Sequence, residues 1–167
     1  MRETATGRTV TAQEPREIPW LSIVFGFGPM MPFVGGAALA WWLRGDAGNA
    51  VLIATALWSC AILLFLSGVR RGVSFRTEGG ATLAQMMTML GYFGTGLVAL
   101  GATYLGWMTT ALSVLLAAYI TMPVLDAIAA RRGEAPLFFA RLRPVQIPLA
   151  IASLAAMLIL ALVSGHV

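Results

Sequence analysis

The chain alternates between five long apolar stretches and short polar segments. Each stretch has no charged residue and is roughly 20 residues long, the length that a helix needs to cross the hydrocarbon core of a bilayer. Strands are excluded because the stretches are too long and do not alternate strictly. A helix also satisfies every backbone amide without water. We predict an all-α, polytopic transmembrane bundle within residues 18–167, with spans at about 20–43, 47–69, 81–100, 103–125 and 145–163.

The segment before the first stretch has a different character. Residues 1–17 are polar, mixed in charge and without periodicity, which predicts a disordered tail. Ala38-Leu39-Ala40 resembles a signal-peptide cleavage site. The apolar run is too long for a signal peptide and continues through Trp41-Trp42-Leu43, so we expect no cleavage.

The arginines are unevenly distributed among the loops. All 11 basic residues are arginine. With five spans, the tail and the loops after spans two and four share one side, and the other side holds only Arg44. The positive-inside rule then predicts a cytoplasmic N-terminus and an external C-terminus. Adding or removing one span would scatter the arginines to both sides.

Composition excludes a soluble domain. Hydrophobic residues make up 59% of the chain and charged residues 11%, against about 25% charged residues in soluble domains. The net charge of +4 does not indicate nucleic-acid binding, because the arginines lie in short loops. We expect the lipid bilayer and anionic phospholipid headgroups as partners.

The first span contains two prolines three residues apart. Pro29 and Pro32 lack amide donors and clash with preceding carbonyls, so we predict a kink or break in this helix. One reading is a broken helix whose free carbonyls bind an ion or substrate. The other, which we favour, is a kinked helix satisfied by its neighbours.

The third span carries a polar face formed by Gln85, Thr88, Tyr92 and Thr95. This face predicts either a polar path for a proton or solute, or a hydrogen-bonded seam with another helix. We favour the seam, because proton relays normally include an acid or a histidine.

Asp126 lies at the end of the fourth span, on one face with Tyr119 and Met122. An arginine on the same side of the membrane is its expected partner, and such a pair would pin the ends of two spans. A protonatable acid is the alternative reading. The candidate partners are Arg70, Arg71, Arg141 and Arg143.

The loop before the last span is also informative. Phe138 and Phe139 with Arg141 and Arg143 predict a short amphipathic patch in the headgroup layer. Pro144 is then expected in the first turn of span five.

The sequence has no motif for catalysis or cofactor binding. The methionines are scattered without cysteine or histidine companions, so packing is favoured over copper binding. Cys60 lies in an apolar run and is expected to be a small core residue, and His166 is the only histidine. We therefore expect no catalytic residue, no metal site and no cofactor.

Short motifs over residues 18–163 make the chain resemble a five-span membrane family, domain of unknown function 3429, also called transmembrane protein 69-like. The resemblance implies a bacterial inner membrane, or a mitochondrial inner membrane in a eukaryote, and no established activity. The chain departs from the family at Arg70-Arg71, where many members are expected to have histidine and tryptophan. The residues that carry the resemblance are Pro19, Gly26, Pro32-Phe33, 65–69, Gly72, Asp126, 136–139 and 141–143.

These observations favour a non-catalytic accessory, assembly or scaffold component of a membrane complex, with a membrane-protein partner or as a homo-oligomer. A small transporter or channel that uses Pro29, Pro32 and the polar face of span three is the alternative. An enzyme acting on lipid at the arginine-rich interface ranks far behind both.

Overall fold

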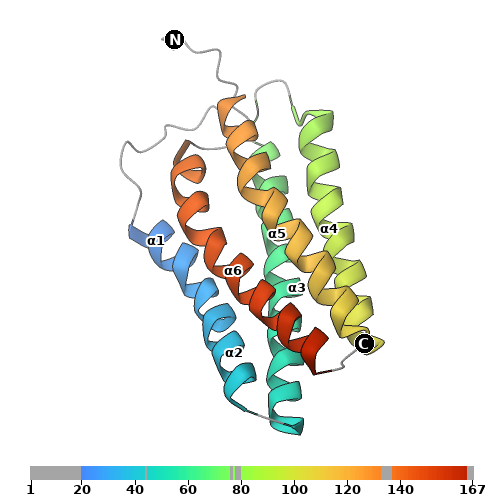
Figure 1. Ribbon diagram of the computed structural model, residues 1–167. Coiled ribbons are helices and arrows are strands. Elements are labelled where there is room, and N and C mark those ends of the chain that lie inside the picture. The colour runs from blue at the N-terminus through green and yellow to red at the C-terminus, as the bar shows by residue number, and fades with distance from the viewer. Residues whose placement is uncertain (1–19, 44, 76, 78–79, 133–136, 165–167) are drawn as a thin grey trace, which may run out of the picture.

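The described part of the chain is helical and contains five units that are long and apolar enough to cross a membrane. The computed structural model describes residues 20–43, 45–75, 77, 80–132 and 137–164. The predicted tail, residues 1–17, lies outside them. The elements are α1 (Trp20–Phe27), the 3-10 segment η1 (Gly28–Met30), α2 (Met31–Trp42), α3 (Asp46–Ser74), α4 (Leu83–Tyr104), α5 (Met108–Arg131) and α6 (Leu137–Val163) (Figure 1). The prediction of an all-α bundle is confirmed for these residues, as is the prediction of five units with the length and apolar character that crossing a membrane requires.

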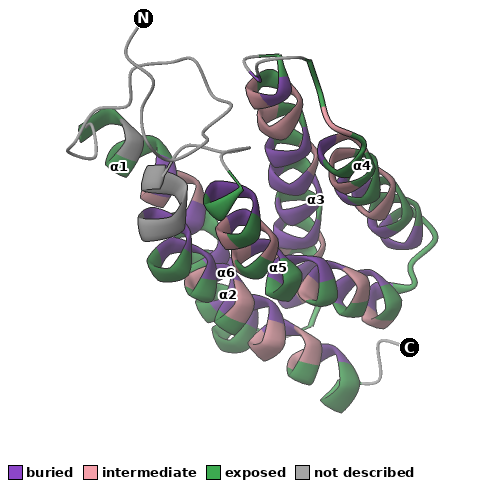
Figure 2. Cartoon of the chain, turned by 90° about the horizontal axis from the view of Figure 1, so that it is seen from above, coloured by how far each residue is buried: buried purple, intermediate pink, exposed green. Residues whose placement is uncertain are grey.

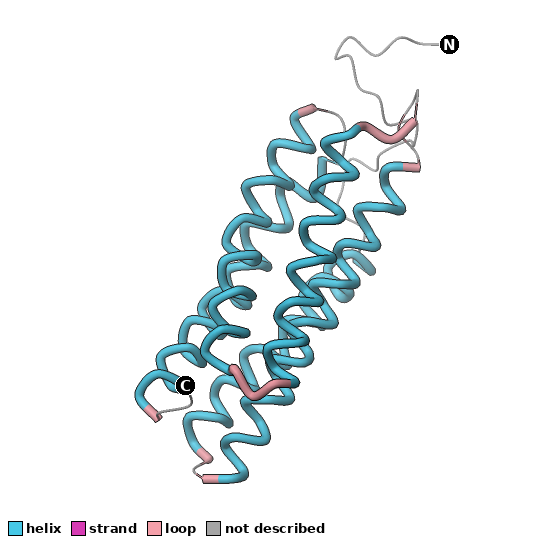
Figure 3. The backbone as a smooth tube through the Cα atoms, turned by 90° about the vertical axis from the view of Figure 1, so that its right-hand side faces the viewer, coloured by secondary structure: helices cyan, strands magenta, loops and turns pink. Residues whose placement is uncertain are grey.

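The five units form a closed ring. Successive units run in opposite directions (Figures 1 and 3). Each of α2, α3, α4 and α5 packs against the next helix, and α6 returns to α2. A smaller contact between α3 and α5 crosses the inside of the ring. The view from above shows buried residues turned toward the middle and exposed residues turned outward (Figure 2). The ends of α3 and α5 therefore lie beside the starts of α4 and α6.

Local sequence signals fix where α4 begins and where the next turn lies. The Thr82 hydroxyl accepts a hydrogen bond from the Gln85 amide, and the Gln85 side chain accepts one from the Thr82 amide. This capping box satisfies two donors at the helix start. Gly106, between α4 and α5, has a φ of 79°, a conformation that favours glycine.

Four helices extend beyond the apolar stretches that predicted them. α3 continues to Ser74, α4 to Tyr104 and α5 to Arg131, and α6 begins at Leu137. In α3, α5 and α6 the backbone hydrogen bonds continue past the charged side chains that limited the predicted spans. Pro144 therefore lies in the interior of α6 rather than in its first turn, and that prediction is wrong. The expected separate patch at 138–139 is part of the same continuous helix, although its side chains lie outside the described residues.

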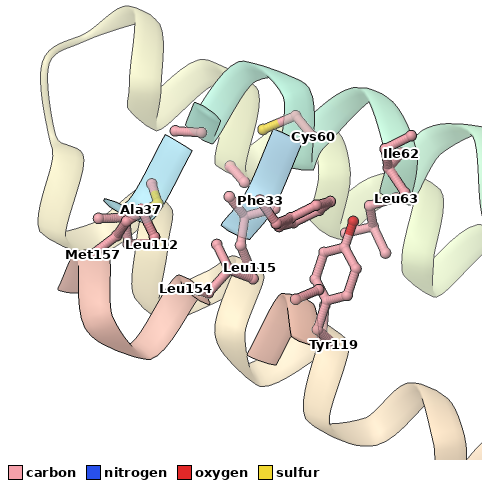
Figure 4. Packing of buried hydrophobic residues seen from close by; sticks show 14 of the residues in the cluster. Phe33, Ala37, Cys60, Ile62, Leu63, Leu112, Leu115, Tyr119, Leu154 and Met157 are labelled. Carbon is pink, nitrogen blue, oxygen red and sulfur yellow. The ribbon is translucent and has the colours of Figure 1, made fainter. Parts of the chain in front are cut away.

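The centre of the ring is filled by apolar side chains from all five units (Figure 4). Phe33 and Tyr119 meet edge to face, with ring centroids 5.5 Å apart, a favourable aromatic geometry. The Tyr119 hydroxyl donates to the backbone carbonyl of Ser59 at 3.0 Å. Tyr119, Met122 and Asp126 are all buried, which confirms that their shared face points inward.

α2 packs closely on α3 at Gly36. A Cβ atom there would lie 2.1 Å from the hydroxyl oxygen of Thr55. The neighbouring Gly35 is exposed, and a Cβ atom at that position would contact nothing within 4 Å. Glycine is therefore required sterically at position 36 and not at position 35.

Candidate functional site

A buried ionic cluster joins the helices at the arginine-rich end of the bundle. Asp126 of α5 is 4% exposed. Its Oδ1 accepts a hydrogen bond from Nη2 of Arg70 on α3, and its Oδ2 lies 3.5 Å from Nε of Arg143 on α6. Two guanidinium groups therefore compensate one carboxylate, which offsets the cost of removing the carboxylate from water.

The cluster also reaches α4 through an aromatic ring. The Arg70 guanidinium lies over the Tyr92 ring, 5.2 Å from its centroid, within the range of a cation–π interaction. The Tyr92 hydroxyl is 3.5 Å from the hydroxyl of Thr121 on α5. Arg70, Tyr92, Asp126 and Arg143 consequently link α3, α4, α5 and α6 at one end of the ring.

Of the four candidate partners of Asp126, Arg70 and Arg143 belong to this cluster and Arg71 does not. Arg71 donates to the Ser74 hydroxyl at 3.2 Å and lies over Phe75 instead. Consecutive helical residues point about 100° apart, so Arg70 and Arg71 cannot both face α5. The Arg141 side chain lies outside the described residues.

The proline-containing segment of span one is a local tightening of the helix. Gly28–Met30 forms a 3-10 turn between α1 and α2, and the flanking residues Phe27 and Met31 remain in the right-handed helical region. Pro32 lies in the first turn of α2. The indole of Trp58 on α3 donates to the Pro29 carbonyl at 3.0 Å. At least one carbonyl at this break is thus satisfied by a neighbouring helix.

The polar face of span three makes an interhelical contact at Tyr92, whereas its two threonines bond within their own helix. Gln85 caps α4 and donates to the Thr77 hydroxyl at 2.9 Å. Thr88 and Thr95 each donate to a carbonyl of their own helix, four residues back. Threonine in a helix often makes this bond. Among these four side chains only Tyr92 has an observed hydroxyl contact with another membrane-spanning helix.

A cavity adjoins the ionic cluster between α3, α4 and α5. It has a volume of about 90 Å³ and is lined by Arg70, Gln85, Asp126 and Arg132, among others. Thr88 and Leu125 line both this cavity and a larger open groove of about 570 Å³ between α4 and α5. The cavity and the groove are therefore neighbours, with Thr88 and Leu125 at their common boundary.

Three features of the structure were not predicted from the sequence. Trp58 was not connected to the proline break, although a tryptophan in the middle of a span was a signal for it. Arg132 was treated only as a loop cation. A Cβ atom added at Gly94 or Gly101 of α4 would have no neighbour within 4 Å; Gly94 is partly exposed and Gly101 is exposed. Assigning them to the outside of the bundle required the rotation of α4, which follows from packing.

The described residues contain no group of three or more His, Cys, Asp or Glu side chains that could hold a metal ion. Cys60 is buried in the core. The cluster around Asp126 joins helices through charge and hydrogen bonding. Comparison of the chain with family models, with curated proteins and with solved structures gives no match.

Proposed function

We propose that this protein is a non-catalytic accessory or scaffold component of a membrane complex, and that it docks on its partner through the outward face of α4. The observation that carries the proposal is a pair of outward glycines on this helix. Added Cβ atoms at Gly94 and Gly101 would each find open space. Glycine in a helix interior costs roughly 1 kcal/mol relative to alanine, so packing within the chain does not account for these two.

The residues around these glycines suit a partner helix. Gly94 and Gly101 are seven residues apart, so they lie on one face of α4. Leu90 and Val98 project on the same side and are more than half exposed. Small residues let two helix backbones approach closely in a membrane, and larger neighbours then pack around the crossing point. This face is the proposed docking face.

The inside of the bundle also supports a static role. The ring encloses a packed apolar core, with Phe33, Leu63, Leu112, Leu115 and Tyr119 fully buried. At one end, the ionic cluster holds four helices in a fixed arrangement. Such a body presents a rigid outer surface to a partner and has little room for a solute along its axis.

For the orientation, we infer that the arginine-rich end faces the cytoplasm of a bacterial cell, with the protein in the inner membrane. In a eukaryote the mitochondrial inner membrane is the corresponding location. The described arginine side chains support this orientation, because Arg70, Arg71, Arg131, Arg132 and Arg143 all belong to the end where α3 and α5 finish and α6 starts. The resemblance to transmembrane protein 69-like proteins agrees with the same location.

A matched pair of glycine variants tests the docking face. Gly94→Leu places a bulky side chain on the proposed face, whereas Gly35→Leu places the same side chain at an exposed position of α2 where space is also open. Protein extracted in a mild detergent is isolated through an affinity tag, and its partners are identified by native electrophoresis and mass spectrometry. A homo-oligomer appears in the same experiment as a multiple of the chain mass.

We expect wild type and Gly35→Leu to migrate in the same larger assembly, and Gly94→Leu to be released from it. Both variants should unfold at or above the wild-type temperature as isolated chains, because leucine favours the helix more than glycine does. Wild-type protein that always runs as a single chain would reject the accessory role. An assembly that survives Gly94→Leu would reject the proposed face.

A small transporter or channel is the second candidate, and one observation favours it. The groove between α4 and α5 is lined by Thr88, Tyr92, Thr95 and Thr121. Ion flux in liposomes that is lost in Thr95→Val but retained in Ser113→Ala, an exposed hydroxyl elsewhere on α5, would favour transport. Gln85→Leu is less informative, because Gln85 also caps α4.

A further inference from the structure

We propose that the cavity beside Asp126 and the groove between α4 and α5 together bind one anionic phospholipid. The phosphate would lie near Arg132 and Arg70, and one acyl chain would follow the groove. This site is separate from the proposed docking face, because the groove lies on the α5 side of α4 whereas Gly94 and Gly101 point away from the bundle.

The first argument is the charge at the cavity. Asp126 is already compensated by Arg70 and Arg143. Arg132, the residue that follows α5, adds a further positive charge to the cavity lining. Within the described residues, no ion pair or side-chain hydrogen bond involves Arg132. Among the described residues that line the cavity, Arg70 and Arg132 outnumber the single acid Asp126, and this excess of positive charge favours an anion.

The second argument is depth. Asp126 lies five residues before the last residue of α5, and each residue adds about 1.5 Å along a helix. The cavity therefore opens within about 10 Å of the helix end. Because α5 has 24 residues, about 36 Å of helix, and the hydrocarbon core is about 30 Å thick, we infer that the phosphate groups of the bilayer lie near this level. A ligand at this boundary would have its charged group in the cavity and its apolar part in the hydrocarbon core.

The third argument is the common boundary of the two hollows. From Thr88 and Leu125 the groove continues along Gly91, Val114 and Ala118, away from the arginines. Its lining combines small and apolar residues with the hydroxyl-bearing Thr88, Tyr92, Thr95 and Thr121. The hydroxyl groups of Thr88 and Thr95 are bonded to their own helix, so their methyl groups remain to contact a ligand. A volume of about 570 Å³ lies within the usual range of roughly 300–1,000 Å³ for ligand sites.

Glycerophospholipids are a better match to these features than soluble anions are. A free phosphate would use the cavity but leave the groove unexplained. A neutral phospholipid would use the groove but not the excess charge of Arg132. The combination of a cationic cavity and a neighbouring, mostly apolar groove selects an amphiphile with a negatively charged headgroup.

The test uses two pairs of variants and a defined lipid. Purified full-length protein in detergent is titrated with phosphatidylglycerol, and bound lipid is counted by native mass spectrometry. Arg132→Gln removes the cavity cation, and Arg131→Gln removes an equally exposed neighbour that does not line the cavity. Gly91→Leu fills the groove without a clash, and Gly35→Leu is its control. Unfolding temperatures without lipid verify that all four variants are folded.

Wild type, Arg131→Gln and Gly35→Leu are expected to retain one phosphatidylglycerol. Arg132→Gln should weaken binding about tenfold, the size expected for loss of one charge-assisted contact, and Gly91→Leu should weaken it by a similar factor. Phosphatidylcholine, titrated in parallel, should bind at least tenfold more weakly than phosphatidylglycerol.

Three results would overturn the proposal. Equal losses in Arg131→Gln and Arg132→Gln would show diffuse attraction to the arginine-rich end. Equal binding of phosphatidylcholine would show that the headgroup charge is not recognised. Inorganic phosphate that protects Arg132 from an arginine-specific reagent as well as phosphatidylglycerol does would show that the groove contributes nothing. None of these results depends on whether the protein has a membrane partner.

Discussion

Arg143 on α6 and Asp126 on α5 meet inside the bundle, with Nε and Oδ2 separated by 3.5 Å. The other carboxylate oxygen is held by Arg70 from α3. A single buried acid thus receives one arginine from each of two other helices. The ionic cluster therefore sets the relative positions of three helix ends. Asp126 and Arg70 also line the cavity of the proposed lipid site.

Asp126→Asn should reduce stability strongly. The substitution keeps the shape of the side chain but removes the charge that compensates the buried Arg143 and the partly buried Arg70, and breaking a buried pair costs about 3 kcal/mol or more. Thermal unfolding in detergent measures the effect. Asp46→Asn, at an exposed acid in the first turn of α3, is the control and should cost less than about 1 kcal/mol. Equal unfolding temperatures for the two variants would contradict the structural role of the ionic cluster.

The adjacent glycines of α2 should respond in opposite directions to alanine. Gly36→Ala would push a methyl group into the Thr55 side chain and separate α2 from α3, so we expect destabilisation of about 1–3 kcal/mol. Gly35→Ala adds a methyl group in open space and should stabilise the helix by up to about 1 kcal/mol. Unfolding temperatures of the two variants provide the comparison. A shift of the same sign in both would refute the close packing of α2 on α3.

Tyr119→Phe should have a small effect, and Tyr119→Ala a large one. The phenylalanine variant loses only the hydrogen bond to the Ser59 carbonyl, worth about 1 kcal/mol. The alanine variant also loses the contact with Phe33 and leaves a cavity, at a cost of about 3–5 kcal/mol. Chemical unfolding in detergent distinguishes the two. If the hydroxyl alone accounted for most of the loss, the core would be held by polar contacts rather than by packing.

The number of spanning helices could be predicted from the sequence, because length and the absence of charge are properties of each segment alone. The helix ends could not. α6 begins at Leu137, eight residues before its uncharged stretch, because the backbone stays helical through the segment that contains Arg141 and Arg143. Pro144 suggested a helix start, but it lies inside α6. Proline is tolerated inside a membrane helix when its surroundings satisfy the freed carbonyl.

The site was predicted only in outline. Asp126 and the need for an arginine follow from one acid beside a basic loop. The choice of Arg70 over Arg71 depends on how α3 is rotated against α5, and the sequence pattern near the end of a mostly apolar helix does not specify that rotation. The polar face of α4 was read as a seam because its spacing is helical. Its threonines instead bond to their own backbone, an outcome that side-chain spacing does not reveal.

The central claim is that five helices cross the membrane and place the arginine-rich end in the cytoplasm. The most direct test joins reporters to the two chain ends in living cells, with alkaline phosphatase active only outside the cytoplasm and green fluorescent protein fluorescent only inside it. We predict fluorescence from the N-terminal fusion and phosphatase activity from the C-terminal fusion. Both ends reporting from the same side would require an even number of spans and would contradict this account.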